Sequence, residues 1–145
     1  MKHLFLALTV TVASIFQMAK ASEPITPTVL ASFKSTYASA QEVNWTVVDN
    51  TYKAFFKLDG KYATAYYAPD GSWIGTSRSI PVTELSSKLK FDLRKELKRA
   101  WISDLIILST NEGDVYFATI ESADAKKIVK SENGRKWSDY QTFEK

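Results

Sequence analysis

Apolar and polar residues alternate over residues 43–78, and three sequences typical of tight turns interrupt the alternation. Asp49-Asn50 and Asp59-Gly60 suit two-residue hairpin turns, whose central residues need positive φ angles. Ala68–Gly71 suits a type I turn followed by a glycine bulge. A period of two between such turns predicts four antiparallel strands joined by hairpins.

Counting outward from the three turns predicts the register of these strands. The predicted pairs are Trp45–Ala54, Val43–Phe56, Phe56–Ala63, Ala54–Ala65, Tyr52–Tyr67, Ala63–Ser77, Ala65–Gly75 and Tyr67–Trp73. They put a strip of small residues, flanked by aromatic ones, on one face of the sheet. A helix can pack closely on such a strip. We therefore expect Trp45 and Phe56 to be buried on the helix side, with Phe55 and Tyr66 on the other side.

The opposite face mixes polar residues with aromatic ones, and it is the candidate binding surface. Aromatic rings and arginine on a rigid sheet suit protein binding, because they offer a large contact area at a small loss of rotamer entropy. An ordinary solvated sheet face has a similar composition, so that interpretation also stays open. The candidate protein-binding residues are Lys53, Phe55, Lys57, Tyr62, Tyr66, Ile74 and Arg78.

Two stretches with helical spacing precede the predicted strands. The first covers residues 27–37 and starts at Pro27, which suits the first turn of a helix. Its apolar residues Val29, Leu30 and Phe33 are predicted to face the sheet. The second covers residues 81–100 and has leucines four residues apart, namely Leu85, Leu89, Leu93 and Leu97. Its basic positions favour a solvated helix face over a nucleic-acid or membrane surface.

Strand patterns also follow the second helical stretch, over residues 105–108, 115–120, 126–130 and 135–143. Each half of the chain has a proline near its helix start, an aromatic-rich strand, and a turn ending in glycine shortly before a tryptophan. We therefore expect an α+β fold of tandem helix-plus-four-strand antiparallel units, with the helices packed on one face of a curved sheet. The predicted units are residues 22–80 and 81–145, forming one compact domain. The register of the last hairpin stays open.

Residues 1–21 have the features of a secretory signal peptide. Lys2 and His3 form a charged start, and the apolar run over residues 4–13 is short for a membrane span. Ala19-Lys20-Ala21 matches the small-x-small cleavage pattern. Cleavage after residue 21 leaves 124 residues, enough for one compact domain. The expected location is the periplasm or the extracellular medium, with no membrane contact after cleavage.

Loss of the signal peptide also changes the chemistry of the chain. It leaves 17 basic and 16 acidic residues, so the pI near 9.0 is no argument for a nucleic-acid partner. The only histidine is lost with it, and the chain has no cysteine. The common nucleophilic triads and zinc sites are therefore excluded. Ser87-x-x-Lys90 matches a β-lactamase nucleophile motif without its companion motifs. We expect a protein without catalytic activity, metal or cofactor.

A set of aromatic residues and glycines carries a family resemblance. The set is Trp45, Tyr52-x-Ala54-x-Phe56, Gly60, Ala65 and Gly71-x-Trp73, followed by Ile80-Pro81 and a helix. It resembles the PepSY-like, β-lactamase-inhibitor-protein-like exported proteins of Gram-negative bacteria. The resemblance implies the tandem architecture described above and a role in binding or inhibiting other exported proteins, such as peptidases or cell-wall enzymes. Two features depart from it: the chain lacks the inhibitors' disulfides, and its second half has Gly134-x-x-Trp137 in place of Gly-x-Trp.

These observations favour a non-catalytic exported binding module that uses its open sheet face on a protein partner, whose identity the sequence does not specify. An alternative is a periplasmic carrier or sensor that holds a small apolar ligand between helix and sheet. A third hypothesis, a carboxylate-dependent hydrolase, has less support, because the acidic turn residues are spread over separate hairpins.

Overall fold

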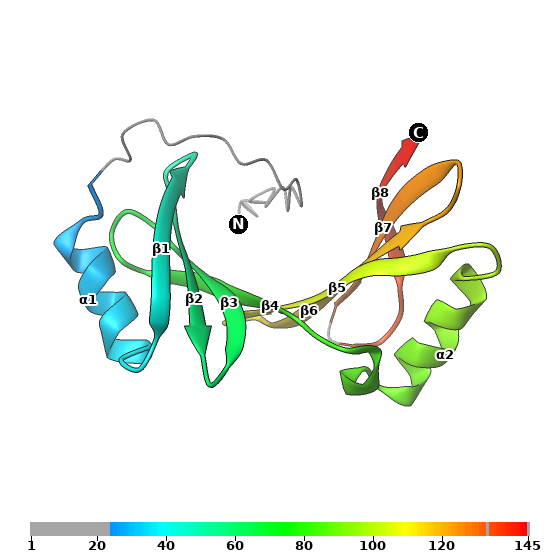
Figure 1. Ribbon diagram of the computed structural model, residues 1–145, viewed down its shortest axis with the longest axis horizontal. Helices are drawn as coiled ribbons and strands as arrows, with labels where there is room; N and C mark the ends of the chain where they lie inside the picture. Colours follow the sequence, from blue (N-terminus) through cyan, green and yellow to red (C-terminus); the bar gives the residue numbers. More distant parts are fainter. Residues whose placement is uncertain (1–23, 133, 145) are drawn as a thin grey trace, which may run out of the picture.

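The computed structural model of the protein describes residues 24–132 and 134–144 (Figure 1). The predicted signal peptide lies outside the described residues. Two α-helices occur in the described part of the chain, α1 (Pro27–Thr36) and α2 (Ser87–Glu96), with a short 3-10 helix η1 (Val82–Glu84) before α2. The strands are β1 (Gln41–Val48), β2 (Thr51–Leu58), β3 (Lys61–Tyr67), β4 (Trp73–Ser79), β5 (Trp101–Thr110), β6 (Gly113–Glu121), β7 (Ala125–Glu132) and β8 (Ser138–Glu144).

All eight strands form one continuous antiparallel sheet, in the order of the chain from β1 to β8. The expectation of tandem helix-plus-four-strand units is therefore wrong. Strands β4 and β5 pair directly, from Thr76 opposite Ser109 to Ser79 opposite Ile106. An edge strand leaves backbone N–H and C=O groups unpaired. The pairing of β4 with β5 satisfies two such edges and leaves only β1 and β8 at the margins of the sheet.

The register predicted around the first two hairpins is confirmed for most pairs. Trp45 lies opposite Ala54, and the three predicted pairs between β2 and β3 are all present. The predicted pair of Val43 with Phe56 is absent, because the register of β1 shifts between Gln41 and Asn44. Glu42 lies within this shift and has a φ angle of 53°. A bulge of this kind adds a residue to one strand and redirects the side chains beyond it.

A second bulge changes the prediction for β4. Tyr67 lies opposite Trp73 as expected, but the register then shifts, and Ala65 lies opposite Thr76 in place of Gly75. The predicted pairs of Ser77 with Ala63 and of Gly75 with Ala65 are therefore wrong. Beyond the bulge, every side chain of β4 lies on the face opposite to the predicted one, because side chains in a strand alternate with a period of two.

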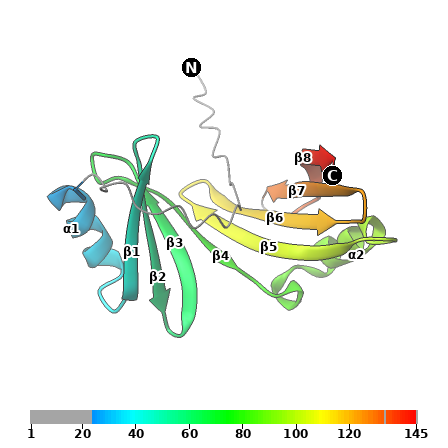
Figure 2. The ribbon, with the colours of Figure 1, turned by 45° about the horizontal axis from the view of Figure 1, so that its top comes forward.

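Each helix covers its own hydrophobic core on the same face of the sheet. Val29 and Phe33 of α1 are buried against Ala54, Phe56 and Ala65. Leucines of α2 pack against β5, β6 and β7, in a second cluster that comprises Ile80, Leu85, Leu89, Leu93, Leu105, Ile107, Ala118, Ile120 and Val129. The sheet curves between the two cores, so that both of its ends rise away from the helices (Figures 1 and 2). The face opposite the helices therefore lies on the inner side of the curve.

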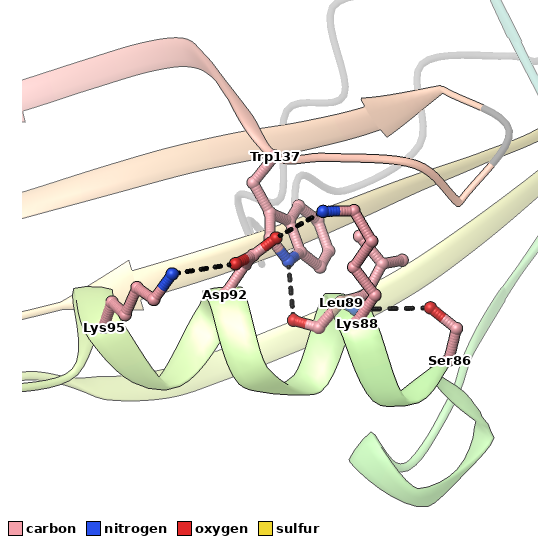
Figure 3. A network of polar contacts seen from close by, with 6 residues as sticks. All are labelled: Ser86, Lys88, Leu89, Asp92, Lys95 and Trp137. Atoms are coloured by element: carbon pink, nitrogen blue, oxygen red, sulfur yellow. Dashed lines mark hydrogen bonds and ion pairs between the residues drawn. The ribbon is translucent and has the colours of Figure 1, made fainter.

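The second helix is shorter than predicted. The segment expected as one helix over residues 81–100 contains η1, then a break, and then α2. Ser86 ends the break and starts α2, because its hydroxyl accepts a hydrogen bond from the N–H of Leu89 at 3.2 Å. The indole of Trp137, which packs against the second core, donates to the carbonyl oxygen of Leu89 at 3.0 Å (Figure 3). This bond ties the connection between β7 and β8 to the helix.

Gly71, in the turn between β3 and β4, makes a close approach to α1. It has a φ angle of +84°, and a Cβ atom there would lie 2.7 Å from the Cγ2 atom of Thr28. Gly71→Ala is expected to lower the free energy of unfolding by more than about 1 kcal/mol, measured by urea denaturation. Gly60→Ala is the matched control, because Gly60 has a φ of +78° and no atom within 4 Å of the added Cβ. Equal losses in both variants would show that the contact with α1 is not tight.

Candidate functional site

The face of the sheet without helices, called the open face below, is defined by an unbroken row of paired residues. Residues directly opposite each other on neighbouring strands share a face. The row runs across seven strands through Asn44, Phe55, Thr64, Ser77, Leu108, Val115 and Glu132. Side chains two residues away from a member of this row lie on the same face. Both ends of the sheet therefore contribute to one surface.

Four residues at the β1–β3 end of the open face form an ordered group, called the first cluster: Glu42, Phe55, Lys57 and Tyr62. The rings of Phe55 and Tyr62 stack with centroids 5.1 Å apart and an angle of 4° between their planes. The Nζ atom of Lys57 lies 5.6 Å from the centre of the Tyr62 ring. Phe55 and Tyr62 remain 45% and 47% exposed, so the cluster presents aromatic surface to solvent in a fixed arrangement.

Glu42 holds the first cluster together through polar contacts. Its carboxylate accepts a hydrogen bond from the hydroxyl of Tyr62 at 2.8 Å and one from Lys57 at 3.3 Å. The Tyr62 bond is the main reason why the pKa of Glu42 is lowered, with Lys57 next. The same bond raises the pKa of Tyr62, because it favours the protonated phenol. The carboxylate therefore stays ionised and fixes both neighbours near neutral pH.

Lys53 and Tyr66 lie beside the first cluster on the open face. They are directly opposite each other on β2 and β3, with the ammonium group 5.9 Å from the centre of the ring. The hydroxyl of Tyr66 lies 3.1 Å from the hydroxyl of Ser77 on β4. That contact fixes the tilt of the Tyr66 ring and confirms that Ser77 belongs to this face.

Five of the seven predicted site residues lie together on the open face: Lys53, Phe55, Lys57, Tyr62 and Tyr66. Arg78 does not join them. Thr76 lies on the helix face, where its hydroxyl is 2.6 Å from that of Tyr37, the C-cap residue of α1. Arg78 lies two residues further along the same strand, and so on the same face, and it binds Glu84 of η1 at 2.8 Å. Ile74 lies at the bulge of β4, where strand alternation no longer assigns it to the open face. Both differences result from the one-residue shift in β4.

Several open-face residues were not among the predicted site residues. Glu42 was missed because a bulge with positive φ redirects the start of β1, and no glycine marks it. A second group at the other end of the face was missed because the last hairpin had no predicted register. This second cluster comprises Phe117, Lys130, Glu132 and Tyr140. The sequence signal that could have identified this second cluster is the recurrence of lysine and glutamate together with aromatic residues on β6–β8.

Acidic side chains in the described residues are not gathered into a metal-binding group. The described residues contain no group of three or more His, Cys, Asp or Glu side chains placed to hold a metal ion. Within the same ranges, no helix combines the length and apolar character needed to cross a membrane. In the first and second clusters, the acids Glu42 and Glu132 are ion-paired with lysines.

Comparison with known proteins agrees with the architecture. A scan against protein families gives no match, and neither does a search of curated proteins. Solved structures from Bacteroides species are similar in fold. A DUF2874 family protein from Bacteroides ovatus superimposes with a TM-score of 0.73 at 16% identity, covering 85% of this chain and 89% of that one.

Two further structures extend the similarity. A BLIP-like protein from Bacteroides fragilis gives a TM-score of 0.70 at 16% identity, covering 86% of this chain and 89% of its own. A Bacteroides eggerthii protein described as a candidate periplasmic protein gives 0.73 at 13% identity, covering 84% and 90%. Identities this low establish the fold and nothing beyond it. The chain therefore has the fold of the BLIP-like and DUF2874 proteins, in which one curved antiparallel sheet carries helices on one face.

Proposed function

We propose that this chain is a non-catalytic, exported protein-binding module that uses the open face on another exported protein, as an inhibitor or an adaptor. The observation that carries the proposal is the first cluster, in which exposed aromatic rings are held by cross-strand stacking and a shared carboxylate. Ordered rings at a surface bind proteins well, because little rotamer entropy is lost on association. The signal peptide predicted over residues 1–21 supports export to the periplasm or the medium.

The fold similarity supports the same function at a coarser level. A BLIP-like protein is among the similar structures, and another is described as a candidate periplasmic protein. Membership of the PepSY-like family is part of the proposal and rests on the aromatic and glycine pattern of residues 45–81. The target stays unnamed, because neither the pattern nor the fold identifies one.

The interior between α1 and the sheet weighs against the alternative of a small-ligand carrier. Val29, Ala54, Phe56 and Ala65 are all 0% exposed. The Phe33 ring makes edge contacts with Phe56 at 5.1 Å. Side chains therefore fill the space that an apolar ligand would need.

The function is tested by retaining exported proteins on the immobilised mature chain and then measuring the affinity of variants for the partner found. Tyr66→Ala is expected to weaken binding more than tenfold, because a central aromatic anchor typically contributes about 2 kcal/mol or more. Lys57→Ala is expected to change the affinity less than about threefold and to act mainly on the association rate and its salt dependence.

Phe91→Ala is the matched control for the loss of an exposed ring. Phe91 lies on α2, away from the open face, and is 62% exposed. Its removal is expected to leave binding unchanged. Wild-type affinity for both Tyr66→Ala and Phe55→Ala would disprove the open-face proposal. The basic side of residues 88–99 and the hairpin of residues 126–136 would then be the next surfaces to test.

A further inference from the structure

The first and second clusters contain the same four kinds of residue: a lysine, a tyrosine, a phenylalanine and a glutamate. In the second cluster, the ring centroids of Phe117 and Tyr140 are 5.5 Å apart. The Nζ atom of Lys130 lies 5.8 Å from the centre of the Tyr140 ring. The same ammonium group binds the carboxylate of Glu132 at 2.9 Å. The first cluster has the corresponding contacts at 5.1, 5.6 and 3.3 Å.

The two clusters face the same side of the sheet. Phe55 of the first cluster and Glu132 of the second are the ends of one row of paired residues from β2 to β7. Between them lie small hydroxyl and aliphatic side chains, among them Ser77 and Leu108. The first cluster is centred on β2 and the second on β7. Neighbouring strands are about 4.8 Å apart, so five strand spacings separate the cluster centres by roughly 24 Å along the sheet. The curvature of the sheet puts both of its ends around the inner side of one curve (Figure 1).

The charges on this face indicate what kind of surface would fit it. Lys57 and Lys130 are each neutralised by a glutamate of their own cluster. A polyanion such as a nucleic acid or an acidic lipid surface would have to compete with those carboxylates. Lys53 differs, because its contact is the Tyr66 ring and, among residues 24–132 and 134–144, no carboxylate forms an ion pair with it. One partner carboxylate near Lys53 would pair with its ammonium group.

We propose that the two clusters are paired anchors for a single folded protein, different from this chain, whose contacting surface is close to neutral. That surface would present two apolar side chains roughly 24 Å apart, one for each cluster, and one carboxylate opposite Lys53. The proposal rests on the function proposed above and adds the size and chemistry of the partner surface. When two sites engage one rigid partner, contact at one raises the effective concentration at the other. Loss of either cluster should therefore weaken contact at both.

Photo-crosslinking in the producing cells tests this coupling with the full chain. A benzophenone amino acid is placed at Thr64 or at Val115, which lie on the open face beside the first and second clusters and leave both intact. Both probes are expected to give an adduct of the same mass. Tyr140→Ala is expected to lower the yield from position 64 about tenfold, and Tyr62→Ala to lower the yield from position 115 to a similar extent.

Two controls separate a specific effect from a general one. A probe at Phe91 on α2 is expected to give no adduct of that mass. Lys53→Glu is expected to lower the yield from both open-face probes at least tenfold, whereas the same charge reversal at Lys34 on α1 leaves them unchanged. Circular dichroism of the purified variants checks that each one is folded, and only folded variants are compared.

The possible outcomes distinguish this proposal from the proposed function. Adducts of different masses, or yields that do not depend on the distant cluster, would overturn the paired anchors and leave an open-face binding function in place. An adduct with the mass of two copies of this chain would show that the occupant is a second copy, which also overturns the proposal. No adduct from either open-face probe would count against both the paired anchors and the proposed function.

Discussion

Replacing Phe56 by alanine is expected to lower the free energy of unfolding by about 3–5 kcal/mol. Phe56 is 0% exposed, and its ring lies 5.1 Å from that of Phe33 and 4.6 Å from that of Tyr37. Truncation removes apolar contacts and leaves a cavity that the neighbouring rings cannot fill without moving. Single domains are typically stable by about 5–15 kcal/mol, so this one change would remove a large part of the total. Urea denaturation followed by circular dichroism measures it.

The adjacent residue provides the control. Phe55 has the same side chain on the same strand, but it points to the open face and is 45% exposed. Phe55→Ala is expected to cost about 1 kcal/mol or less, because exposed rings lose little burial when removed. A larger loss for Phe55→Ala than for Phe56→Ala would contradict the assignment of the two faces.

Leu89→Ala is expected to destabilise the protein by about 2–5 kcal/mol, through the second core. Leu89 is 1% exposed on the side of α2 that packs on the sheet. Its carbonyl oxygen, which accepts the bond from Trp137, is backbone and is kept in the variant. Phe91→Ala, on the exposed side of the same helix, is the control and is expected to change the stability by about 0.5 kcal/mol or less.

Because all strands belong to one sheet, the stability losses of Phe56→Ala and Leu89→Ala are expected to combine in a defined way. Phe56 and Leu89 belong to different core clusters, so their effects should add in the double variant. Because β4 and β5 pair across the middle of the sheet, both changes are expected to shift one cooperative transition. Two separate transitions in the double variant or in either single one would show that the halves unfold independently.

The local sequence was sufficient to predict the β1–β2 and β2–β3 hairpins, which have two-residue turns. Asp59-Gly60 limits the turn to two residues with positive φ angles, and this sets the register of β2 and β3. The faces of Phe55 and Phe56 follow from that register by alternation. Five residues of the candidate surface could thus be grouped from sequence, and their role in binding stays a prediction.

Other features could not be predicted because they depend on contacts between distant segments. The bulge in β4 moves Arg78 to the helix face, where Glu84 binds it, and no turn residue in the sequence marks that shift. Glu42 adopts a φ angle of 53° although it is not a glycine. Its carboxylate contacts Lys57 and Tyr62, which are 15 and 20 residues away in sequence. The second cluster required the register of the last hairpin, which its turn left open.

By itself, the sequence determined the first two hairpins, the helix at residues 27–36, the buried leucine spacing, and the absence of histidine and cysteine chemistry after residue 21. These follow from short-range turn geometry, side-chain periodicity and composition. Tertiary structure alone decided that β4 and β5 join eight strands into one sheet. It also decided that two clusters at least 55 residues apart in sequence, from Tyr62 to Phe117, share a face. The physical reason is that unpaired strand edges and exposed cores are satisfied only between segments that are distant along the chain.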